Sequence, residues 1–260
     1  MDLQLKDKII LITGGAKGIG EAIVRGVVHE SGIPVIVDVD VEAGKQLQSE
    51  IQNSGNTCGL ICEDLLSAEN CFRSVEQTLK EFGRLDVLIN NAGVNDGIGL
   101  ENGSPGRFVT SLQKNLLHYY NMAHYALPAL KKSQGVIVNI ASKTALTGQG
   151  GTSGYVAAKG AILALTREWA AELLPFGIRV NAVIPAEVMT PLYKQWLSSF
   201  PNPDEKLKQI VAKIPLGKRM TNVNEIAAMV LFLSSAQASH ITGQHLFVDG
   251  GYVHLDRALT

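Results

Sequence analysis

Cysteine is scarce in this chain. Cys58, Cys62 and Cys71 are its three thiols among 260 residues, and no two of them form a Cys-x-x-Cys pair. An odd number of cysteines without that spacing offers neither a disulfide framework nor a cysteine-based metal site. The histidines also lack the spacing of metal ligands. We therefore predict reduced thiols, a cytoplasmic location and no bound metal ion.

Excess charge and long apolar runs are absent as well. The formal net charge is −1 at pH 7, which gives no reason to expect nucleic acid or a membrane surface as a partner. No apolar stretch approaches the ~20 residues needed to span a bilayer. Residues 1–7 lack the charged and then apolar pattern of a secretion signal. These absences predict a protein with neither a nucleic-acid partner nor a membrane partner.

What the chain does contain is an alternation of short apolar segments and amphipathic ones. The apolar segments predict strands near residues 8–13, 34–38, 57–62, 86–90, 135–140, 178–183 and 245–249. The amphipathic segments predict helices near residues 18–31, 41–54, 67–82, 107–132, 153–174 and 223–235. Such alternation is typical of a parallel sheet covered on both faces. The sequence therefore predicts an α/β fold: one doubly wound, Rossmann-type domain over residues 1–260, with a seven-stranded, mainly parallel sheet flanked by helices.

A glycine-rich turn follows the first predicted strand. It reads Thr13-Gly14-Gly15-Ala16-Lys17-Gly18-Ile19-Gly20 and opens a predicted helix. Glycines here allow a tight turn and a close approach of the backbone to a pyrophosphate, and the helix N-terminus offers N–H groups to the phosphates. Alone, such a motif also occurs as an ordinary turn. Its place between a strand and a helix favours a dinucleotide site.

Asp38 ends the second predicted strand, eighteen residues after Gly20. That is close to the spacing of a carboxylate that binds the adenosine ribose, and such a group repels the extra phosphate of NADP. Lys17 favours the opposite choice, because its ammonium could reach that phosphate. We expect the carboxylate to dominate, since each ~1.4 kcal/mol of unfavourable contact lowers affinity tenfold. The sequence predicts NAD as the cofactor rather than NADP.

Tyr155 and Lys159 lie one helical turn apart, and Ser142 precedes the tyrosine by thirteen residues. A spacing of four residues places the phenol and the ammonium on one helix face. A free phenol ionises only near pH ~10, and a nearby ammonium lowers that pKa. Such a tyrosine can exchange a proton with an alcohol or a carbonyl, while Ser142 donates a hydrogen bond to the substrate oxygen. A solvated helix face shows the same spacing, but the dinucleotide motif favours the catalytic interpretation.

These motifs together resemble those of one family. The chain is similar to the classical short-chain dehydrogenases/reductases over nearly all its length, through Thr13-Gly14-x-x-x-Gly18-x-Gly20, Asn90-Asn91-Ala92-Gly93, Ser142 and Tyr155-x-x-x-Lys159. The resemblance implies a catalytic tetrad of Asn115, Ser142, Tyr155 and Lys159. In that scheme Tyr155 is the acid/base and Ser142 orients the substrate oxygen. Lys159 lowers the pKa of the tyrosine and holds the nicotinamide ribose, and Asn115 holds a water that links Lys159 to solvent.

The resemblance also implies how the cofactor is bound. Asp64 and Leu65 would contact adenine, the turn 90–93 would lie beneath the cofactor, and Thr190 would contact the nicotinamide carboxamide. Where the family often has Pro-Gly-x-Val-x-Thr, this chain has Ala186 in place of the glycine, a departure that can shift the local backbone. The cofactor-binding residues predicted in this way are Gly14, Lys17, Gly18, Ile19, Gly20, Asp38, Asp64, Leu65, Asn91, Ala92, Gly93, Tyr155, Lys159, Pro185, Val188 and Thr190.

The substrate site is predicted from the segments around the tetrad. A polar wall beside Ser142 and Tyr155 would consist of Asn95, Gln149, Glu187 and His254. A steroid or acyl-chain site would be apolar instead. Each of the four side chains could equally point to water. Residues 184–222 hold five prolines and predict an irregular lid over the substrate.

The C-terminal tail, 252–260, runs past the Asp-Gly-Gly ending usual in the family. With residues 185–191 it resembles, more loosely, bacterial sugar dehydrogenases of the L-fucose dehydrogenase type. We hypothesise that the tail reaches a neighbouring subunit, where His254 or Arg257 helps to close the site. The family resemblance itself implies a homotetramer.

The predicted function is the NAD-dependent oxidation of a hydroxyl on a small polar substrate. The hemiacetal or a secondary hydroxyl of an aldose such as L-fucose would lose a proton to Tyr155 and a hydride to NAD. A reductase of 3-oxoacyl thioesters or of another small ketone, using NADH or NADPH, shares every motif and stays open. A non-enzymatic NAD-binding regulator is the third alternative. The intact tetrad argues against it, because a pure binder needs no tuned tyrosine.

Overall fold

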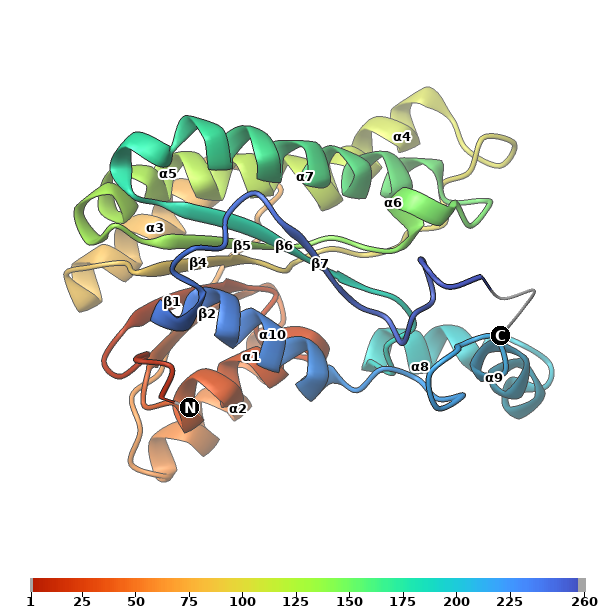
Figure 1. Cartoon of the computed structure of the whole chain (residues 1–260), viewed down its shortest axis with the longest axis horizontal. Helices are drawn as coiled ribbons and strands as arrows, with labels where there is room; N and C mark the ends of the chain where they lie inside the picture. Colours follow the sequence, from red (N-terminus) through yellow and green to blue (C-terminus); the bar gives the residue numbers. More distant parts are fainter. Residues whose placement is uncertain (1, 257–260) are drawn as a thin grey trace.

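The computed structural model describes residues 2–256 and arranges them around one sheet (Figure 1). Within that range the strands are β1 (Ile9–Thr13), β2 (Ile33–Asp38), β3 (Gly59–Cys62), β4 (Val87–Asn90), β5 (Val136–Ile140), β6 (Arg179–Pro185) and β7 (His245–Val248). Their order across the sheet is β3-β2-β1-β4-β5-β6-β7, and every neighbouring pair is parallel. The predicted doubly wound α/β fold is confirmed, with a sheet that is parallel throughout rather than mainly parallel.

Helices cover both faces of this sheet. In the described part of the chain they are α1 (Gly18–His29), α2 (Val41–Asn53), α3 (Ala68–Phe82), α4 (Pro105–Leu112), α5 (His118–Ser133), α6 (Thr144–Thr147), α7 (Ser153–Glu172), α8 (Pro191–Leu197), α9 (Pro203–Val211) and α10 (Val223–Ser234). Short 3₁₀ turns span Leu174–Phe176 and Ala236–Ala238. Figure 1 shows α5 and α7 above the sheet and α1, α2 and α10 below it.

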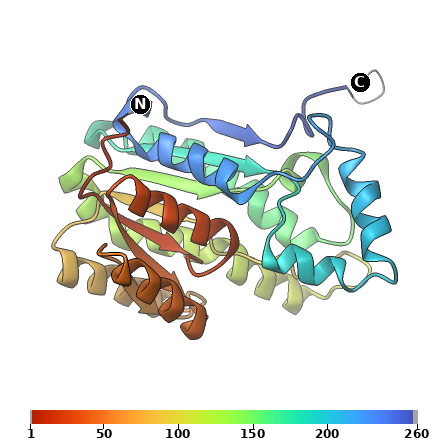
Figure 2. The same cartoon turned by 90° about the horizontal axis from the view of Figure 1, so that it is seen from below.

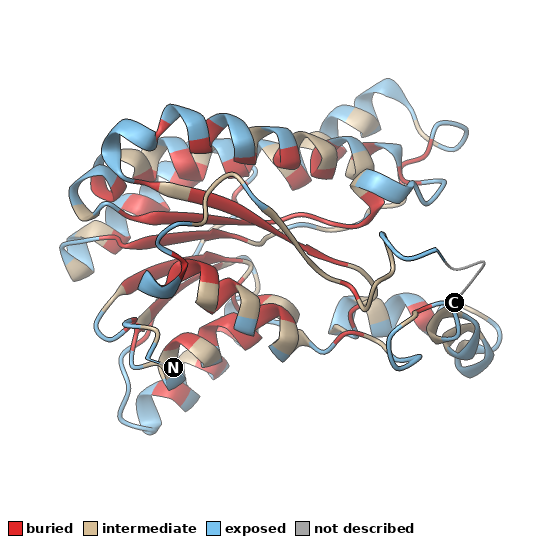
Figure 3. Cartoon of the chain, in the orientation of Figure 1, coloured by how far each residue is buried: buried red, intermediate tan, exposed pale blue. Residues whose placement is uncertain are grey.

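The central strands β1, β4 and β5 are buried on both faces. In β1, Ile9 and Leu11 pack in one core with residues of α3, α5 and α7, whereas Ile10 and Ile12 pack in a second core with α1, α2 and α10. Successive side chains of a strand point to opposite faces, so a strand between two helical layers is apolar at nearly every position. Figure 3 shows this arrangement, with the central strands and the inward helix faces buried and the edge strand β7 half-buried.

The helix predicted over 107–132 is interrupted. It consists of α4, a π-helical turn over Gln113–Leu117, and α5. A single wide turn shifts the apolar pattern by only about one residue, so hydrophobic periodicity does not reveal it. Such turns often occur at functional sites, and this one carries Asn115.

The region predicted as an irregular lid, 184–222, contains α8 and α9. Pro191 and Pro203 stand in the first turns of these helices, where the missing N–H of proline costs no hydrogen bond. The side chains of Thr190 and Asn202 cap the two helices. The prolines therefore start helices here rather than prevent them. Figures 1 and 2 show both helices beyond the carboxyl-terminal ends of the central strands.

All strands end at the same edge of the sheet because all are parallel. Thr13, Asp38 and Asn90 end β1, β2 and β4 at that edge, and Ser142 follows β5. Among residues 2–256, no helix is long and apolar enough to cross a membrane, and no cluster of His, Cys, Asp or Glu is arranged to hold a metal ion. The tail predicted over 252–260 is described only as far as residue 256, so Arg257 lies outside the described residues.

Candidate active site

The glycine-rich turn after β1 requires residues without side chains. Gly14 has a φ of +63°, and a Cβ there would lie 2.9 Å from the Cα of Ala92. A Cβ at Gly20 would lie 1.9 Å from the carbonyl oxygen of Gly14. The N-terminus of α1 opens onto this turn, and its first N–H groups lack intrahelical partners. The turn thus has both the shape and the helix dipole of a phosphate-binding site.

The turn after β4 is joined to the glycine-rich turn by hydrogen bonds. Thr13 Oγ1 accepts from the backbone N–H of Asn91 at 2.9 Å and from that of Ala92 at 3.1 Å. Asn91 Nδ2 donates to the carbonyl oxygens of Thr13 and Gly14, both at 3.0 Å. The residues predicted to bind the cofactor in these two turns therefore form one rigid unit.

Asp38 lies beside the glycine-rich turn. Its Oδ2 accepts from the N–H of Ala16 at 2.9 Å, and its Oδ1 accepts from the N–H of Asp40 at 2.9 Å. Lys17 Nζ pairs with Asp40 Oδ2 at 2.5 Å. The hydrogen bond between these two groups raises the pKa of Lys17 and lowers that of Asp40. The ammonium expected to compete for an NADP phosphate is thus already partnered by a carboxylate.

Asp64 and Leu65 follow β3 at the same sheet edge. Cys62, at the end of β3, is paired with Asp38 at the end of β2. Leu65 is buried, whereas Asp64 is exposed and its Oδ1 accepts from the N–H of Leu66 at 3.1 Å. Both residues follow the strand that pairs with the end of β2, and the contact with adenine that the family resemblance implies stays a prediction.

Lys159 is buried within α7, with 2% of its surface exposed. Its Nζ donates to the carbonyl oxygen of Ile140 at 2.8 Å and to Tyr119 Oη at 3.0 Å. Tyr119 in turn donates to the same carbonyl at 2.9 Å. Burial lowers the pKa of Lys159 to about 7, because the charged form is poorly solvated there. Tyr119 is a partner of Lys159 that the sequence pattern does not distinguish from an ordinary core tyrosine.

Tyr155 lies close to both Lys159 and Ser142. Lys159 Nζ is 5.7 Å from the centre of the Tyr155 ring. Burial raises the pKa of Tyr155, and the hydrogen bond with Ser142 opposes this change. The net change of this pKa in the chain by itself is a rise, and the lowering contribution of Lys159 stays a prediction. Desolvation of the phenolate outweighs the favourable contacts.

Ser142 is oriented by Thr144. Ser142 Oγ accepts from Thr144 Oγ1 at 3.0 Å and from the Thr144 N–H at 3.3 Å. These contacts use the lone pairs of the serine oxygen and leave its hydrogen for donation. Ser142 is therefore positioned as a hydrogen-bond donor toward Tyr155 or toward an oxygen bound beside it.

Asn115 connects the π-helical turn to the turn after β4. Its Oδ1 accepts from the N–H of Val94 at 2.7 Å, and its Nδ2 donates to the Ser111 carbonyl at 3.0 Å. A Cβ at Gly93 would lie 3.1 Å from Asn115 Oδ1 and 3.5 Å from Lys159 Nζ. Asn115 and Lys159 of the predicted tetrad thus meet beside this glycine, while the role of Asn115 in holding a water stays a prediction.

Three of the four residues predicted to form a polar wall are exposed in the described chain, and the wall itself stays a prediction. Asn95 is exposed and accepts a hydrogen bond within its own turn. Gln149 is exposed on the loop after α6. His254 is exposed and packs edge-on against Phe247, with 4.3 Å between the ring centres. Of the four, Glu187 is the one whose side chain is held in a dense set of contacts.

Glu187 belongs to a charged cluster that is not evident in the sequence. Lys143 Nζ forms an ion pair with Glu187 Oε1, and Tyr193 Oη donates to Glu187 Oε2 at 2.8 Å. The Lys143 ammonium also lies 4.0 Å from the centre of the Tyr252 ring. We call Lys143, Glu187, Tyr193 and Tyr252 the Lys143 cluster. It joins the ends of β5, β6 and β7 to α8, and such a contact can be found only once the neighbouring strands are known.

The segment after β6, predicted to line the cofactor, is fixed from both sides. The N–H of Lys143 donates to the carbonyl of Pro185 at 3.0 Å. Val188 forms an isolated parallel bridge with Thr221. A Cβ at Gly18 would lie 3.4 Å from the Cβ of Thr190, so the segment reaches the glycine-rich turn. Ala186 has no positive φ, so alanine fits where the family often has glycine.

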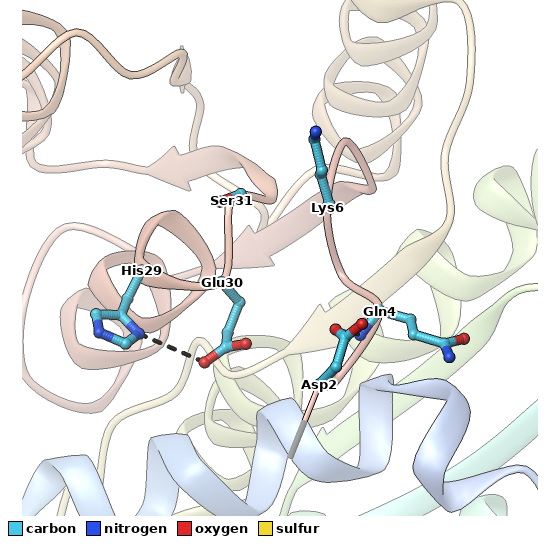
Figure 4. Close-up of a pocket in the computed structure, with 6 residues that line it drawn as sticks. All are labelled: Asp2, Gln4, Lys6, His29, Glu30 and Ser31. Carbon is cyan, nitrogen blue, oxygen red and sulfur yellow. Dashed lines mark hydrogen bonds and ion pairs between the residues drawn. The ribbon is translucent and has the colours of Figure 1, made fainter.

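A separate surface depression lies at the opposite edge of the sheet, before β1 and β2 (Figure 4). It is lined by Asp2, Gln4, Lys6, His29, Glu30 and Ser31. His29 Nδ1 and Glu30 Oε1 are 3.4 Å apart there. No predicted catalytic or cofactor-binding residue lines this depression, so it is not part of the candidate active site.

Comparisons with known proteins agree with this arrangement. A family model described as "Enoyl-(Acyl carrier protein) reductase" matches residues 14–253. L-fucose dehydrogenase from Bos taurus is 36% identical over 252 residues, which cover 96% of this chain and 91% of that protein. The solved structure of Cj0485 dehydrogenase has a TM-score of 0.94 and 47% identity, covering 100% of this chain and 99% of that one. Ligand-free aldohexose dehydrogenase from Thermoplasma acidophilum has a TM-score of 0.89 and 30% identity, covering 99% and 98%.

Proposed function

The chain belongs to the classical short-chain dehydrogenase/reductase family, and from this premise we propose that it is an NAD-dependent sugar dehydrogenase. The family places it among oxidoreductases that act on CH–OH groups with a nicotinamide nucleotide. Our proposal is narrower: the enzyme oxidises the hemiacetal hydroxyl of an aldose such as L-fucose and forms a lactone. The observation that carries it is the buried ion pair between Lys143 and Glu187 beside Ser142.

The residues around the glycine-rich turn fit a dinucleotide. A Cβ at Gly14 or Gly20 would collide with the backbone, so this tight turn requires glycine at both positions, and such a turn lets a pyrophosphate approach the backbone closely. Asp38 would accept hydrogen bonds from the ribose hydroxyls, and the Lys17–Asp40 pair leaves no unpartnered ammonium at this turn to favour the phosphate of NADP. When bound, NAD accepts the hydride from the substrate carbon. These contacts support NAD over NADP.

Ser142 and Tyr155 would act on the reacting hydroxyl. Ser142 has its lone pairs engaged by Thr144 and would donate its hydrogen to the substrate oxygen, holding that oxygen beside Tyr155. Tyr155 would take the hydroxyl proton as hydride leaves the carbon. Tyr155 must first be deprotonated, and in the chain alone burial raises its pKa, so a nearby proton acceptor and a positive charge are both needed.

Lys159 can supply both. With a pKa of about 7, its amine is half protonated near neutral pH, so it can carry charge or pass a proton. Two of its three N–H groups point to Ile140 and Tyr119, which fixes the side chain. The remaining donor would hold the nicotinamide ribose, and Asn115 beyond Gly93 would hold the water that connects Lys159 to solvent.

The Lys143 cluster supports a polar substrate. Lys143 and Glu187 are 9% and 14% exposed at their side chains, so their charges lie in a region largely withdrawn from water. An acyl chain gains nothing from such charges and would leave them desolvated. The hydroxyls of a sugar can hydrogen-bond to both. A bovine relative with L-fucose as its substrate and a solved aldohexose dehydrogenase agree with this assignment.

A reductase of 3-oxoacyl thioesters is the second candidate. The description of the family model, with its acyl carrier protein substrate, favours it. It would require an apolar channel at the carboxyl-terminal edge and would tolerate NADPH. The charges of the Lys143 cluster at that edge argue against such a channel.

The two candidates are separated by the absorbance of reduced nicotinamide. The assay combines NAD or NADP with L-fucose, other aldoses, polyols and simple secondary alcohols, and runs 3-oxoacyl thioesters in the reverse direction. We expect strong reduction of NAD by an aldose. Activity restricted to NADPH and acyl thioesters would contradict the proposal while leaving the family assignment intact.

We also propose that the enzyme is a homotetramer. The helical layer of α4, the π-helical turn, α5 and α7 would pack against a second copy, as the family resemblance implies. Val109, Leu117 and Tyr120 are large apolar side chains exposed on this layer, and burying them would stabilise an assembly. Light scattering should give about four times the chain mass of 27.9 kDa. A monomer mass would contradict this assembly.

A further inference from the structure

The Lys143–Glu187 ion pair occupies an unusual position for two charges. Lys143 follows Ser142 directly, and Glu187 lies between Pro185 at the end of β6 and Thr190 at the glycine-rich turn. The two side chains are only 9% and 14% exposed. Charges of this kind normally lie at the surface. This pair instead lies among the residues assigned to the substrate and the cofactor.

Stability alone does not account for this pair. Removing two charges from water costs free energy that their attraction often fails to recover, and an apolar pair of similar volume is frequently at least as stable. Both charges are nevertheless held in place by additional contacts. Tyr193 of α8 binds the second carboxylate oxygen, and the Tyr252 ring covers the ammonium. Because these contacts hold a charged pair whose burial costs stability, we infer that the pair has a binding role.

The backbone around the pair is rigid. Thr221 donates its N–H to the Glu187 carbonyl at 2.9 Å. Asp249, just after β7, accepts from the N–H of Gly251 at 2.8 Å and from that of Val253 at 2.9 Å. This second turn brings Tyr252 back over Lys143. The pair is therefore preorganised, so binding at this site costs little reordering.

The ion pair has unused hydrogen-bonding capacity. An ammonium has three N–H groups, and within residues 2–256 Glu187 is the one acceptor that pairs with Lys143 Nζ. A carboxylate has about four lone-pair sites on its two oxygens, of which Lys143 and Tyr193 take one each. A donor and an acceptor side by side match two adjacent hydroxyls, one accepting from the ammonium and the next donating to the carboxylate. The Tyr252 ring beside them suits the C–H face of a sugar ring.

We propose that Lys143, acting with Glu187, is the specificity-determining residue that binds two neighbouring hydroxyls of the substrate. This inference rests on the proposed sugar dehydrogenase function and assigns its selectivity to one ion pair. The pair takes no part in the hydride or proton transfer. It selects polyhydroxylated substrates, because a substrate without those hydroxyls leaves both charges desolvated and unmatched.

The test compares Lys143→Met, the double variant Lys143→Met/Glu187→Gln and the wild type. Methionine keeps the length of the side chain without its charge, and glutamine keeps an acceptor for Tyr193. Lys194→Met is the matched control, since Lys194 is an exposed lysine of α8 next to Tyr193. Each protein is assayed with L-fucose, or with the aldose that the wild type oxidises best, and with cyclohexanol. NAD affinity is measured separately by calorimetry.

We expect KM for the aldose to rise at least about tenfold in both variants, as the loss of hydrogen bonds to a charged group implies. We expect kcat to change by less than about threefold, with KM for cyclohexanol and the affinity for NAD unchanged. A merely structural role would weaken NAD binding and turnover of both substrates together. If Lys143→Met fails to fold because Glu187 is left unpaired, the double variant, which removes both charges, gives the result.

The outcomes separate this inference from the proposed function. A wild type that oxidises no aldose refutes the function, and the inference with it. A wild type that oxidises aldoses, beside variants whose KM for the aldose stays within about twofold of the wild type, refutes the role of the ion pair and leaves the function standing. Loss of NAD affinity in parallel with a raised KM also refutes it, because the pair would then be structural.

Discussion

Replacing Lys159 with methionine should stabilise the protein by an amount that depends on pH. Lys159 is 2% exposed, and burial lowers its pKa from 10.5 to about 7. At about 1.4 kcal/mol for each pH unit, a fall of this size corresponds to about 5 kcal/mol of unfavourable free energy for the charged side chain in the folded state. Methionine avoids that cost but loses the hydrogen bonds to Tyr119 and Ile140, which offsets about 2 kcal/mol. The net stabilisation below pH 7 is about 3 kcal/mol.

The pH dependence follows from where the proton is held. Below the folded pKa of about 7, both the folded and the unfolded protein carry the Lys159 proton, and the cost is fully present. Between about 7 and 10.5 the unfolded chain keeps the proton and the folded protein loses it. Wild-type stability therefore rises by about 1.4 kcal/mol per pH unit in that window through this group. Methionine does not titrate, so the advantage of the variant shrinks over the same window.

Urea denaturation of both proteins from about pH 6 to about pH 9 measures this difference, and the contributions of other titrating groups cancel in the subtraction. We expect the advantage of Lys159→Met to be greatest at the lowest pH and to fall by about 2 kcal/mol between pH 7 and pH 9. Lys194→Met controls for the loss of one positive charge. A difference between Lys159→Met and wild type that stays constant across this range would refute the lowered pKa, whatever the absolute stabilities.

Three further substitutions test the catalytic and cofactor assignments. Tyr155→Phe should lower kcat by at least about 10³-fold, since it removes the proposed acid/base, while NAD binding measured by calorimetry should be unchanged. Surviving turnover would rule Tyr155 out as the acid/base. Asp38→Asn keeps the shape of the side chain and removes its charge. The ratio of kcat/KM for NAD to kcat/KM for NADP should therefore fall at least about tenfold, or about 1.4 kcal/mol. An unchanged ratio would mean that Asp38 does not select the cofactor. Gly20→Ala places a Cβ 1.9 Å from the Gly14 carbonyl oxygen. We therefore expect calorimetry to show a loss of NAD affinity and thermal melting to show a fall in stability of about 1–3 kcal/mol. Wild-type affinity for NAD would contradict the tightness of this turn.

The sheet and the main helices could be predicted from local sequence signals. Strands such as Ile9–Thr13 are buried at every position and almost entirely apolar, and the glycine-rich turn is local in the chain. The pairing of Tyr155 with Lys159 is also predictable from local sequence, since one helical turn separates the two residues. The helices α8 and α9 escaped prediction because Pro191 and Pro203 stand at helix starts, where proline is favoured, and proline-rich segments are otherwise typical of loops.

Contacts between distant segments could not be predicted. Tyr119 looks like any core tyrosine until α5 and α7 are packed on the same face, when its hydroxyl meets Lys159. Lys143 and Glu187 meet because β5 and β6 are neighbours in the sheet. Glu187 was proposed as a substrate contact from the sequence, but its lysine partner required the fold. The same holds for the direction of the Tyr155 pKa, which depends on burial and not on spacing.

The proposed reaction transfers a hydride from the hemiacetal carbon of an aldose to NAD. L-fucose carrying deuterium at that carbon, incubated with the enzyme and NAD, tests it in one measurement by mass spectrometry of both products. We expect deuterated NADH together with the unlabelled lactone. Reduced cofactor without deuterium, or no reduction of NAD by the aldose, would contradict it.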